Sequence, residues 1–573
     1  MKAYGIILFF LTGLILVSCK KLDEMNIDPN GIDPSIANPS QLLTTVITRS
    51  GTTVTELGFG QISGVMQQTQ EDGWSGGYND FGWQSSSHDG TWKSLYQNLS
   101  DSKEMMRKAN EANNDFFRAA SLIMTAYNFG HIADFWGDAP YSEALRNDDG
   151  IMNPKYDAQF NIYKGILDDL EQANALLSKA PGSYNTINNG QDVLYSGDIT
   201  KWRRFANSLS IRYNLRLSAK DQSFARDNIT RILGAPDKYP LITAAADEAA
   251  FAYTGNNPSS SWPTNIVGNT DLSSEYHRRK MCSTLVEEMR KHNDPRLGVW
   301  ANKVETPLHL DESKPENYDN IEDVVFNIEG VSATIKCRVI GKGVADAYVQ
   351  KYGVPVNYNL DYIGMPPNWT KLSLFAYNIS PATYQGRPNP HCSMLNSMYQ
   401  LALAPQLKSR MLSAAEVHFD LAEIALKGWG GNAKMEYENA IRTSLESWGL
   451  TSNYTMYLVQ PGVPFDNTLE QIITQKWIAS WSATCEAWFD WRRTGFPNFK
   501  TVGVGAKRDV IPVRLYYPAN EETANADKLR QALPNLEETM YSQQEPDNAT
   551  YPVMKRNSAW AKMWLLQGTG KPW

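Results

Sequence analysis

The sequence predicts a mostly α fold: tetratricopeptide-like helix pairs form a scaffold, and an irregular, loop-rich insertion carries short strands. Before residue 235 and after residue 410, apolar residues recur at spacings of three and four, the pattern of amphipathic helices. Between these regions, residues 236–409 are dense in Pro, Gly, Asn and Ser and contain few long periodic segments. No repeat of fixed period accompanies the helix pairs.

The first 18 residues have the layout of a secretory signal. Lys2 precedes an apolar stretch at residues 6–17, which is shorter than the roughly 20 residues that span a bilayer. The run Leu16-Val17-Ser18-Cys19 resembles a bacterial lipobox, in which the cysteine is diacylated and becomes the new N-terminus. An ordinary signal peptide or a short membrane anchor are the alternatives. We predict lipidation at Cys19 and a lipidated tether over residues 19–40, with one domain over residues 41–573.

Composition excludes several classes of protein. The formal net charge of −8 over 573 residues argues against binding to nucleic acid. Five cysteines are too few for a disulfide scaffold, and none forms a C-x-x-C pair, so the four after Cys19 are expected to be buried small hydrophobes. No second long apolar segment follows the signal.

Helices are expected from residue 39, from residue 92, over 116–129, over 160–177 and from residue 200. They return at Ser413, where Ser413-x-x-Glu416 has the form of a capping box, and again at Thr468-x-x-Gln471. In the middle region, Val325-Phe326 and residues 334–340 are expected to be short strands. Tryptophans on the apolar helical stripes are assigned to the core: Trp92, Trp202, Trp448, Trp477, Trp481 and Trp488.

A second group of aromatic residues lies in loops that have no apolar stripe to join. Such rings can stack on the C–H face of a sugar while neighbouring amides and carboxylates bind its hydroxyls. The alternative, at even odds for any one ring, is that they pin the loops onto the helical body. The candidate ligand-binding residues are Trp74, Tyr78, Trp83, Trp262, Tyr362, Trp369 and Tyr377.

Catalytic and metal-binding motifs are absent from the sequence. There is no H-E-x-x-H, G-x-S-x-G or phosphate-binding loop. The pair Glu287-Glu288 is better explained as a solvated helix face than as a glycosidase pair, and His418 as a satisfied histidine. We expect no cofactor. A structural calcium ion would suit acidic turns such as residues 147–150, but their spacing does not support one.

Five segments, in order along nearly the whole chain, resemble the SusD/RagB family of outer-membrane nutrient-binding lipoproteins, in its SusD-like branch. These segments are Ala133-Asp134-Phe135-Trp136-Gly137-Asp138-Ala139-Pro140-Tyr141-Ser142-Glu143-Ala144, Phe205-Ala206-Asn207-Ser208-Leu209-Ser210-Ile211-Arg212, Ser413-Ala414-Ala415-Glu416-Val417-His418-Phe419-Asp420-Leu421-Ala422-Glu423, Glu486-Ala487-Trp488-Phe489-Asp490-Trp491-Arg492-Arg493-Thr494-Gly495-Phe496-Pro497 and Arg514-Leu515-Tyr516-Tyr517-Pro518-Ala519-Asn520-Glu521. In the fourth segment, Arg492 or Arg493 is expected to bind helix C-terminal carbonyls or a carboxylate.

The resemblance implies a helical scaffold over about residues 41–235 and 410–500, with the ligand site carried by the loop-rich segment 236–409. It also implies a non-enzymatic role at the outer membrane: capture of a glycan, or in some members a peptide, for a SusC-type TonB-dependent barrel. Two rival hypotheses remain, a lipid-anchored glycoside hydrolase and a structural partner of a barrel that binds no ligand itself.

Overall fold

The computed structural model describes residues 38–73, 78–180, 183–184, 189–266, 274–382, 389–499, 510–544 and 556–572. Its elements are mainly helical, which confirms the predicted fold class. Cys19 and the proposed tether up to residue 37 lie outside the described residues. Within the described residues, no helix is both long enough and apolar enough to cross a membrane.

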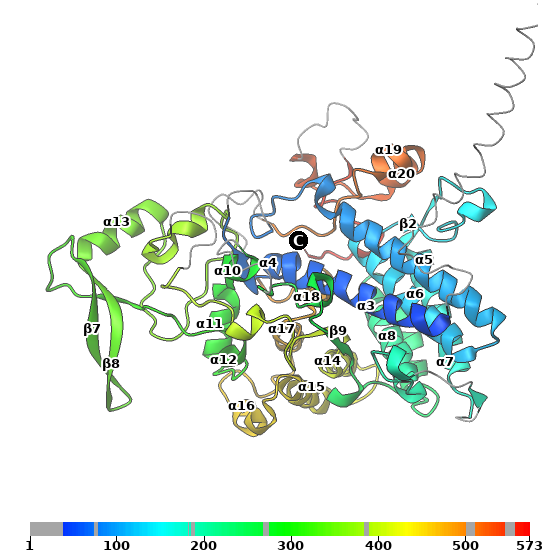
Figure 1. The fold of residues 1–573 in the computed structure, drawn as a ribbon, viewed down its shortest axis with the longest axis horizontal. Helices are drawn as coiled ribbons and strands as arrows, with labels where there is room; N and C mark the ends of the chain where they lie inside the picture. Colours follow the sequence, from blue (N-terminus) through cyan, green and yellow to red (C-terminus); the bar gives the residue numbers. More distant parts are fainter. Residues whose placement is uncertain are drawn as a thin grey trace, which may run out of the picture.

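The first helical region occupies the blue and cyan part of Figure 1. Its helices are α3 (Pro39–Leu57), α4 (Ser63–Val65), α5 (Asp89–Glu111), α6 (Asp115–Trp136), α7 (Gln159–Leu176), α8 (Ile199–Leu217) and α9 (Gln222–Leu233). A π-helical turn, η1 (Gly58–Ile62), joins α3 to α4, so that residues 39–65 form one continuous helical stretch. From α5 to α9, each helix packs against the next in the chain, which builds a layer of helix pairs.

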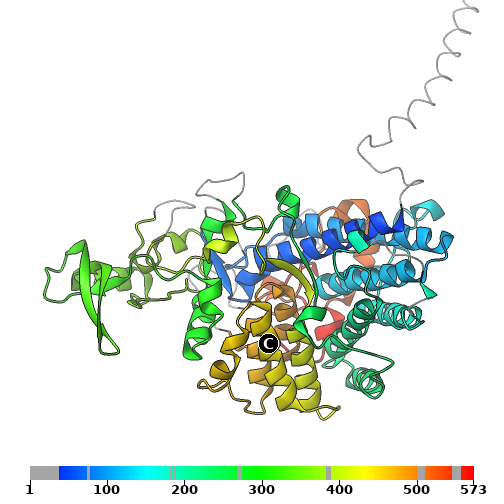
Figure 2. The ribbon, with the colours of Figure 1, turned by 60° about the horizontal axis from the view of Figure 1, so that its bottom comes forward.

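The second helical region follows the loop-rich middle and packs beneath the first (Figure 2). It contains α14 (Ala414–Leu426), α15 (Ala433–Ser447), α16 (Tyr454–Leu458), α17 (Leu469–Ala479) and α18 (Thr484–Thr494), and the chain continues to α19 (Glu521–Ala524) and α20 (Ala526–Ala532). The α14–α15 pair is the closest of these packings, and α14 also contacts α17 and α8. Through α14, therefore, the two helical regions share one core.

In each of the two predicted capping boxes, the structure forms the hydrogen bond to the N-cap hydroxyl but not the reciprocal bond from the N-cap backbone. The Ser413 hydroxyl accepts a hydrogen bond from the Glu416 N–H at 3.1 Å, but the Glu416 side chain binds Arg212 instead of the start of its helix. Likewise, the Thr468 hydroxyl accepts from the Gln471 N–H at 3.2 Å, while the Gln471 amide binds the turn before the helix. A buried guanidinium is a stronger partner for Glu416 than an N-cap N–H, and the sequence pattern could not show it.

The middle region combines short helices with short strands. Its elements are β4 (Ala249–Ala252), α10 (Glu275–Arg278), β5 (Arg279–Met281), α11 (Ser283–Lys291), α12 (Leu297–Trp300), β6 (Leu308–Leu310), β7 (Asp319–Ile328), β8 (Val331–Ile340), α13 (Lys342–Tyr352) and β9 (Lys408–Leu412). Of the remaining short strands, β1 (Thr69–Glu71) pairs with β5, and β2 (Ala139–Pro140) pairs with β3 (Tyr156–Asp157). The strands that the sequence predicts near Val325 and over 334–340 are confirmed, but they extend into a hairpin of two ten-residue strands.

This β7–β8 hairpin projects from the body at the left of both views (Figures 1 and 2). It belongs to a three-stranded sheet in the order β6-β8-β7, in which β6 runs parallel to β8. Apolar side chains near its tip are exposed, with Val325 and Val331 each at 68%. The hairpin therefore adds little to the core.

Helix α3 presses one face against the β4–β9 pair. A methyl group placed on Gly51 would lie 2.4 Å from Cε1 of Phe251 on β4 and 2.7 Å from the Ser409 hydroxyl on β9. Such distances are shorter than any real contact of a Cβ atom, so only glycine permits this approach. The contact joins the first helix to the loop-rich region.

The centre of the molecule holds a buried network of ion pairs, here called the core ionic network. Its acidic members are Asp134, Glu416, Asp420, Glu423, Glu486 and Asp490, and its basic members are Arg212, Arg216, Lys476, Arg492 and Arg493. These residues come from α6, α8, α14, α17 and α18 and are all nearly excluded from solvent. All of them except Arg216 and Lys476 lie in four of the five sequence segments that carry the family resemblance.

The predicted role of the two adjacent arginines is confirmed. Arg492 donates to the backbone oxygens of Asp134 at 2.7 Å and Val513 at 2.8 Å. Arg493 binds the carboxylates of Glu423 and Asp490. The helix α18 then ends at Gly495, which adopts a left-handed conformation (φ 81°).

Candidate ligand-binding site

Four of the seven predicted ligand-binding rings are buried. Trp83, Trp262, Trp369 and Tyr377 have exposed fractions of 2%, 0%, 3% and 6%. Because a covered ring cannot stack on a sugar, the expectation that these four form a binding surface is wrong for this conformation. Their role is the alternative considered above, pinning loops onto the body.

The contacts of these four rings show which parts of the protein each loop packs against. Trp83 lies edge-on against Trp488 of α18, with ring centroids 5.9 Å apart. Trp262 packs against Phe59 of η1 at 5.0 Å. Trp369 and Tyr377 contact each other at 6.0 Å within a separate small core of the middle region. The tryptophans assigned to helical stripes are also buried, as predicted.

The remaining three predicted residues have different positions. Trp74 lies outside the described residues. Tyr78 and Tyr362 are partly exposed. Tyr362 borders an open hollow of about 710 Å³ beside α11 and α12, whereas Tyr78 lies at the place where three distant segments meet. The structure thus does not bring the two exposed rings into one site.

We call the surroundings of Tyr78 the loop junction. Here β1 pairs with β5 in antiparallel register, Gln70 opposite Lys280 and Glu71 opposite Arg279. The third segment is held by a backbone hydrogen bond from the Gly73 N–H to the Lys371 carbonyl at 3.2 Å. The Asn79 amide donates to the Trp369 carbonyl at 2.5 Å and fixes the loop on the same segment. Figure 1 shows α10, which precedes β5, beside α4 near the middle of the molecule.

Charged side chains surround Tyr78 and are paired with one another. The Glu71 carboxylate is bound by Arg278, by Lys371 at 3.0 Å and by Arg279 at 3.7 Å. The Lys371 ammonium also lies 5.3 Å from the centre of the Tyr78 ring, a distance at which cation–π attraction operates. Burial, helped by the charge of Arg278, lowers the pKa of Lys371 to about 8. The same burial raises the pKa of Tyr78.

A second set of ion pairs extends from the buried base of the junction to its solvent-exposed edge. Asp72 binds the fully buried Lys280. Glu275, whose side chain is 48% exposed, binds Arg278 at 3.3 Å and Arg279 at 3.1 Å. The junction therefore presents one partly exposed ring beside the exposed Glu275 carboxylate and the partly buried Arg278 guanidinium, on a base of buried ion pairs. This combination suits recognition of a polar ligand with an apolar face.

The junction is poorly suited to glycoside hydrolysis. That chemistry requires two carboxyl groups across a cleft, one of which keeps a proton at neutral pH. Glu71 is surrounded by three cations and Asp72 by one, an environment that favours the ionised form. Among the described residues, no group of His, Cys, Asp and Glu side chains is arranged to hold a metal ion.

Sequence reasoning missed most of the residues that build the junction: Glu71, Asp72, Glu275, Arg278, Lys280 and Lys371. A signal was present, since an acidic pair stands before the predicted aromatic loop and a run of three basic residues stands at 278–280. Nothing in the local sequence of either segment indicates that the two pair as strands.

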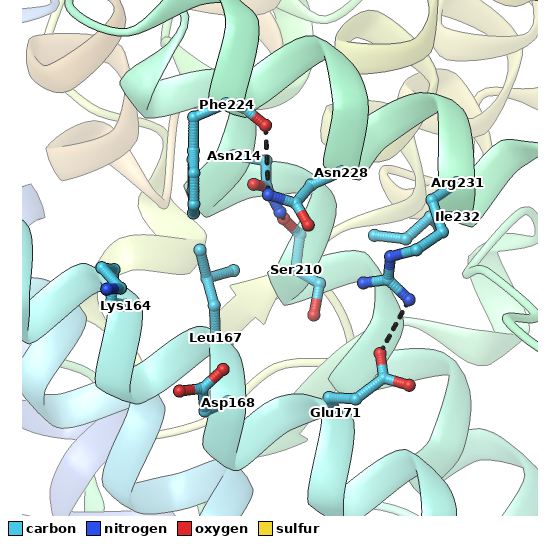
Figure 3. A pocket seen from close by; sticks show the side chains of 10 residues that line it. All are labelled: Lys164, Leu167, Asp168, Glu171, Ser210, Asn214, Phe224, Asn228, Arg231 and Ile232. Atoms are coloured by element: carbon cyan, nitrogen blue, oxygen red, sulfur yellow. Dashed lines mark hydrogen bonds and ion pairs between the residues drawn. The ribbon is translucent and has the colours of Figure 1, made fainter.

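Two further hollows lie on the helical regions. Figure 3 shows a pocket of about 310 Å³ between α7, α8 and α9. Its polar groups are largely engaged with one another: Arg231 binds Glu171 at 3.0 Å, and the Asn228 amide donates to the Phe224 carbonyl at 3.0 Å. A larger groove of about 790 Å³ lies between α3, α5 and the segment that follows β4.

Comparison with known proteins agrees with this architecture. A family model named SusD-like and described as "Starch-binding associating with outer membrane" matches residues 31–331 and 347–518. No curated protein sequence matches the chain.

Solved structures share the fold at low sequence identity. A chitin-binding protein is 20% identical with a TM-score of 0.67, over 92% of this chain and 99% of its own. A SusD homolog from Bacteroides fragilis is 20% identical with a TM-score of 0.63, over the same shares. A SusD-like protein from Bacteroides thetaiotaomicron is 18% identical with a TM-score of 0.62, over 91% and 98%.

Proposed function

Because this chain belongs to the SusD-like family, described as starch-binding and associated with the outer membrane, we propose that it is a lipid-anchored nutrient-binding protein. In this proposal it captures an oligosaccharide at the loop junction and passes it to a SusC-type TonB-dependent barrel. The observation that carries the ligand site is the partly exposed Tyr78 ring, held by Lys371 beside the exposed Glu275 and the partly buried Arg278. Lipid anchoring rests on the lipobox at Leu16–Cys19 and partnering on membership of the family.

Binding without catalysis is the function that the junction supports best. The ring can stack on the apolar face of a sugar, and the exposed edge of the Arg278–Glu275 pair can donate to and accept from neighbouring hydroxyls. The buried pairs beneath keep these groups in place before the ligand arrives, which reduces the entropy lost on binding.

A peptide ligand is the second candidate, favoured by one observation. Arg278 and Glu275 place opposite charges side by side at the accessible edge of the junction, where they could bind a peptide carboxylate and ammonium group. The two ligand classes differ in their response to salt, because binding through charges weakens as ionic strength rises whereas stacking on a sugar does not.

Isothermal titration of residues 20–573 with maltoheptaose, chitohexaose and a panel of short peptides tests the proposal. The variant Tyr78→Ala should weaken oligosaccharide binding about tenfold or more, as expected for loss of a central aromatic contact. Tyr362→Ala is the matched control, since it removes the other partly exposed predicted ring without touching the junction. Equal affinities of wild type and Tyr78→Ala would overturn the assignment of the site.

The rival enzymatic hypothesis and the anchor have separate tests. Release of reducing sugar from maltoheptaose by the purified protein would contradict a purely binding role. Labelling of the full chain with a palmitate analogue in the bacterial host should mark the wild type and leave Cys19→Ala unmarked.

A further inference from the structure

The groove between α3, α5 and the segment after β4 is separate from the loop junction. Helix α3 forms its floor, α5 one wall and residues 251–260 the other. Its volume of about 790 Å³ falls in the range of small-molecule sites, roughly 300–1,000 Å³. No residue of the loop junction lines it.

The floor of the groove is a stripe of polar side chains along one face of α3. Thr45, Thr48, Thr52, Thr53 and Glu56 recur at helical spacing on this face. The opposite face of the same helix carries the buried residues that pack in the core. Hydroxyls and amides also line both walls, including those of Ser94, Gln97, Asn257, Ser259 and Ser260.

Several polar groups that line the groove have no hydrogen-bond partner among the described residues, and two of them, Asn98 and Glu56, bear on the ligand. Asn98 on α5 is 1% exposed, and its Nδ2 amide makes no hydrogen bond. Buried amides of folded proteins nearly always have an acceptor, so an orphaned donor in the wall of a groove indicates a place for one. Glu56 is exposed and forms no ion pair or hydrogen bond with any described residue, and the partial desolvation of its carboxyl raises its pKa.

The charges at the rim determine which ligands fit. Arg49 and Asp101 neutralise each other at 2.9 Å, which leaves the Glu56 carboxylate as the unbalanced charge of the groove. An anionic ligand would meet this carboxylate without a free cation to compensate. A neutral ligand rich in hydroxyls would instead find acceptors in Glu56 and the threonines, and a donor in Asn98.

We propose that this groove is a second binding site, specific for a neutral, hydroxyl-rich segment of an oligosaccharide. It holds the ligand through hydroxyls and amides, because the two rings that line it, Phe251 and Tyr253, are buried and offer no face for stacking. It is therefore the weaker of the two sites. The continuous helical stretch from α3 to α4 leads from the groove toward the junction (Figure 1). Glu56 and Val65 are roughly 15 Å apart along this helix, from a rise of 1.5 Å per residue. One long glycan could occupy both sites and gain affinity through effective concentration.

A fluorophore placed in the groove tests the proposal directly. The described cysteines are all buried, so a single introduced thiol can be labelled selectively. Ser100→Cys puts an environment-sensitive dye on the exposed wall of the groove, and Lys434→Cys puts it on distant α15 as the control. Maltoheptaose and chitohexaose, added to residues 20–573, should change the emission at position 100 in a saturable way and leave position 434 silent.

Variants separate the groove from the junction. Thr53→Trp fills the floor and should weaken the response at position 100 about tenfold or more, while calorimetric binding at the junction persists. Glu56→Arg is a second groove variant that reverses the charge of Glu56 instead of filling the floor, and it should weaken the response as well. In a Tyr78→Ala background the response should remain, because it then reports the groove alone.

The outcomes distinguish this site from the junction. Calorimetric binding without any response at position 100 would overturn the groove and leave the junction standing. A response that both Thr53→Trp and Glu56→Arg leave unchanged, with melting temperatures like the wild type, would also overturn it. Absence of both signals with every oligosaccharide would reject the two sites together.

Discussion

The core ionic network and the α3–α5 groove each contain an acidic side chain, Glu486 and Glu56, and the pKa values of these two are shifted in opposite directions. In the network, burial alone would raise the pKa of Glu486, but Arg212 and Arg216 outweigh it and lower that pKa to about 2. In the groove, Glu56 has no cation and its pKa is raised. The comparison teaches that charge by itself does not mark a binding site. A buried acid whose partners are already present holds the fold together, whereas Glu56, an exposed acid with no ion-pair partner among the described residues, adds no such link.

Removing an acid from the network should have the largest effect. Glu486→Ala leaves Arg212 and Arg216 buried without their shared carboxylate, so we expect a loss of about 3–5 kcal/mol in the free energy of unfolding. Urea denaturation followed by circular dichroism measures it. The control is Asp346→Ala, which breaks an exposed pair with Lys342 at 2.6 Å and should cost less than about 0.5 kcal/mol. Equal losses in the two variants would show that the network adds no more stability than a surface ion pair.

Substitutions on the two faces of α3 should differ in how much they lower the free energy of unfolding, by a smaller amount than the first pair of variants. Gly51→Ala forces a methyl group against Phe251 and Ser409 and is expected to cost about 1–3 kcal/mol through overpacking. Thr53→Ala, on the groove face of the same helix, should stay within about 0.5 kcal/mol. Thermal or urea unfolding of both variants checks the difference. If Gly51→Ala were as stable as Thr53→Ala, the close approach of α3 to β4 would not be a constraint.

The smallest change in stability is expected from a carboxylate of α7. This change should also depend on pH. Burial, together with the charge of Asp168, raises the pKa of Asp169 to about 7. Between pH 4 and 7, the unfolded chain loses this proton while the folded chain keeps it, so stability falls as the pH rises through this range. Asp169→Asn cannot ionise and should therefore gain about 1–2 kcal/mol over the wild type at pH 8, with no gain near pH 4.

Unfolding in urea at pH 4 and pH 8 measures this difference. Asp168→Asn is the informative control, because it removes the neighbouring charge but leaves the buried carboxyl, and it should give a smaller gain. A gain from Asp169→Asn that is the same at both pH values would contradict the assignment of a raised pKa.

The helical regions could be predicted from the sequence because their information is local. Apolar residues such as Trp202 and Trp488 recur at helical spacing and are buried where expected. The hairpin could be predicted only in part, since Val325 and Phe326 signal a strand but its full pairing with residues 331–340 depends on register.

The candidate site was less predictable because its parts come from far apart. Tyr78 could be selected as a loop aromatic, but Trp262 and Trp369 have the same local sequence character and are buried. Whether a loop ring faces solvent depends on which other segment covers it. Lys371 gave no local signal at all, since it acquires its role only through contact with Glu71, 300 positions earlier in the chain.

The β7–β8 hairpin has a consequence for how the molecule meets other chains. Within the described sheet, β7 has a neighbour on one side only, and such an outer strand can add a strand from another protein. If two molecules joined edge to edge in antiparallel fashion about Ile321, Asp319 of each would lie opposite Asp323 of the other. Like charges opposite one another disfavour that pairing. The projection thus resists self-association while its backbone stays open to a strand that carries basic side chains.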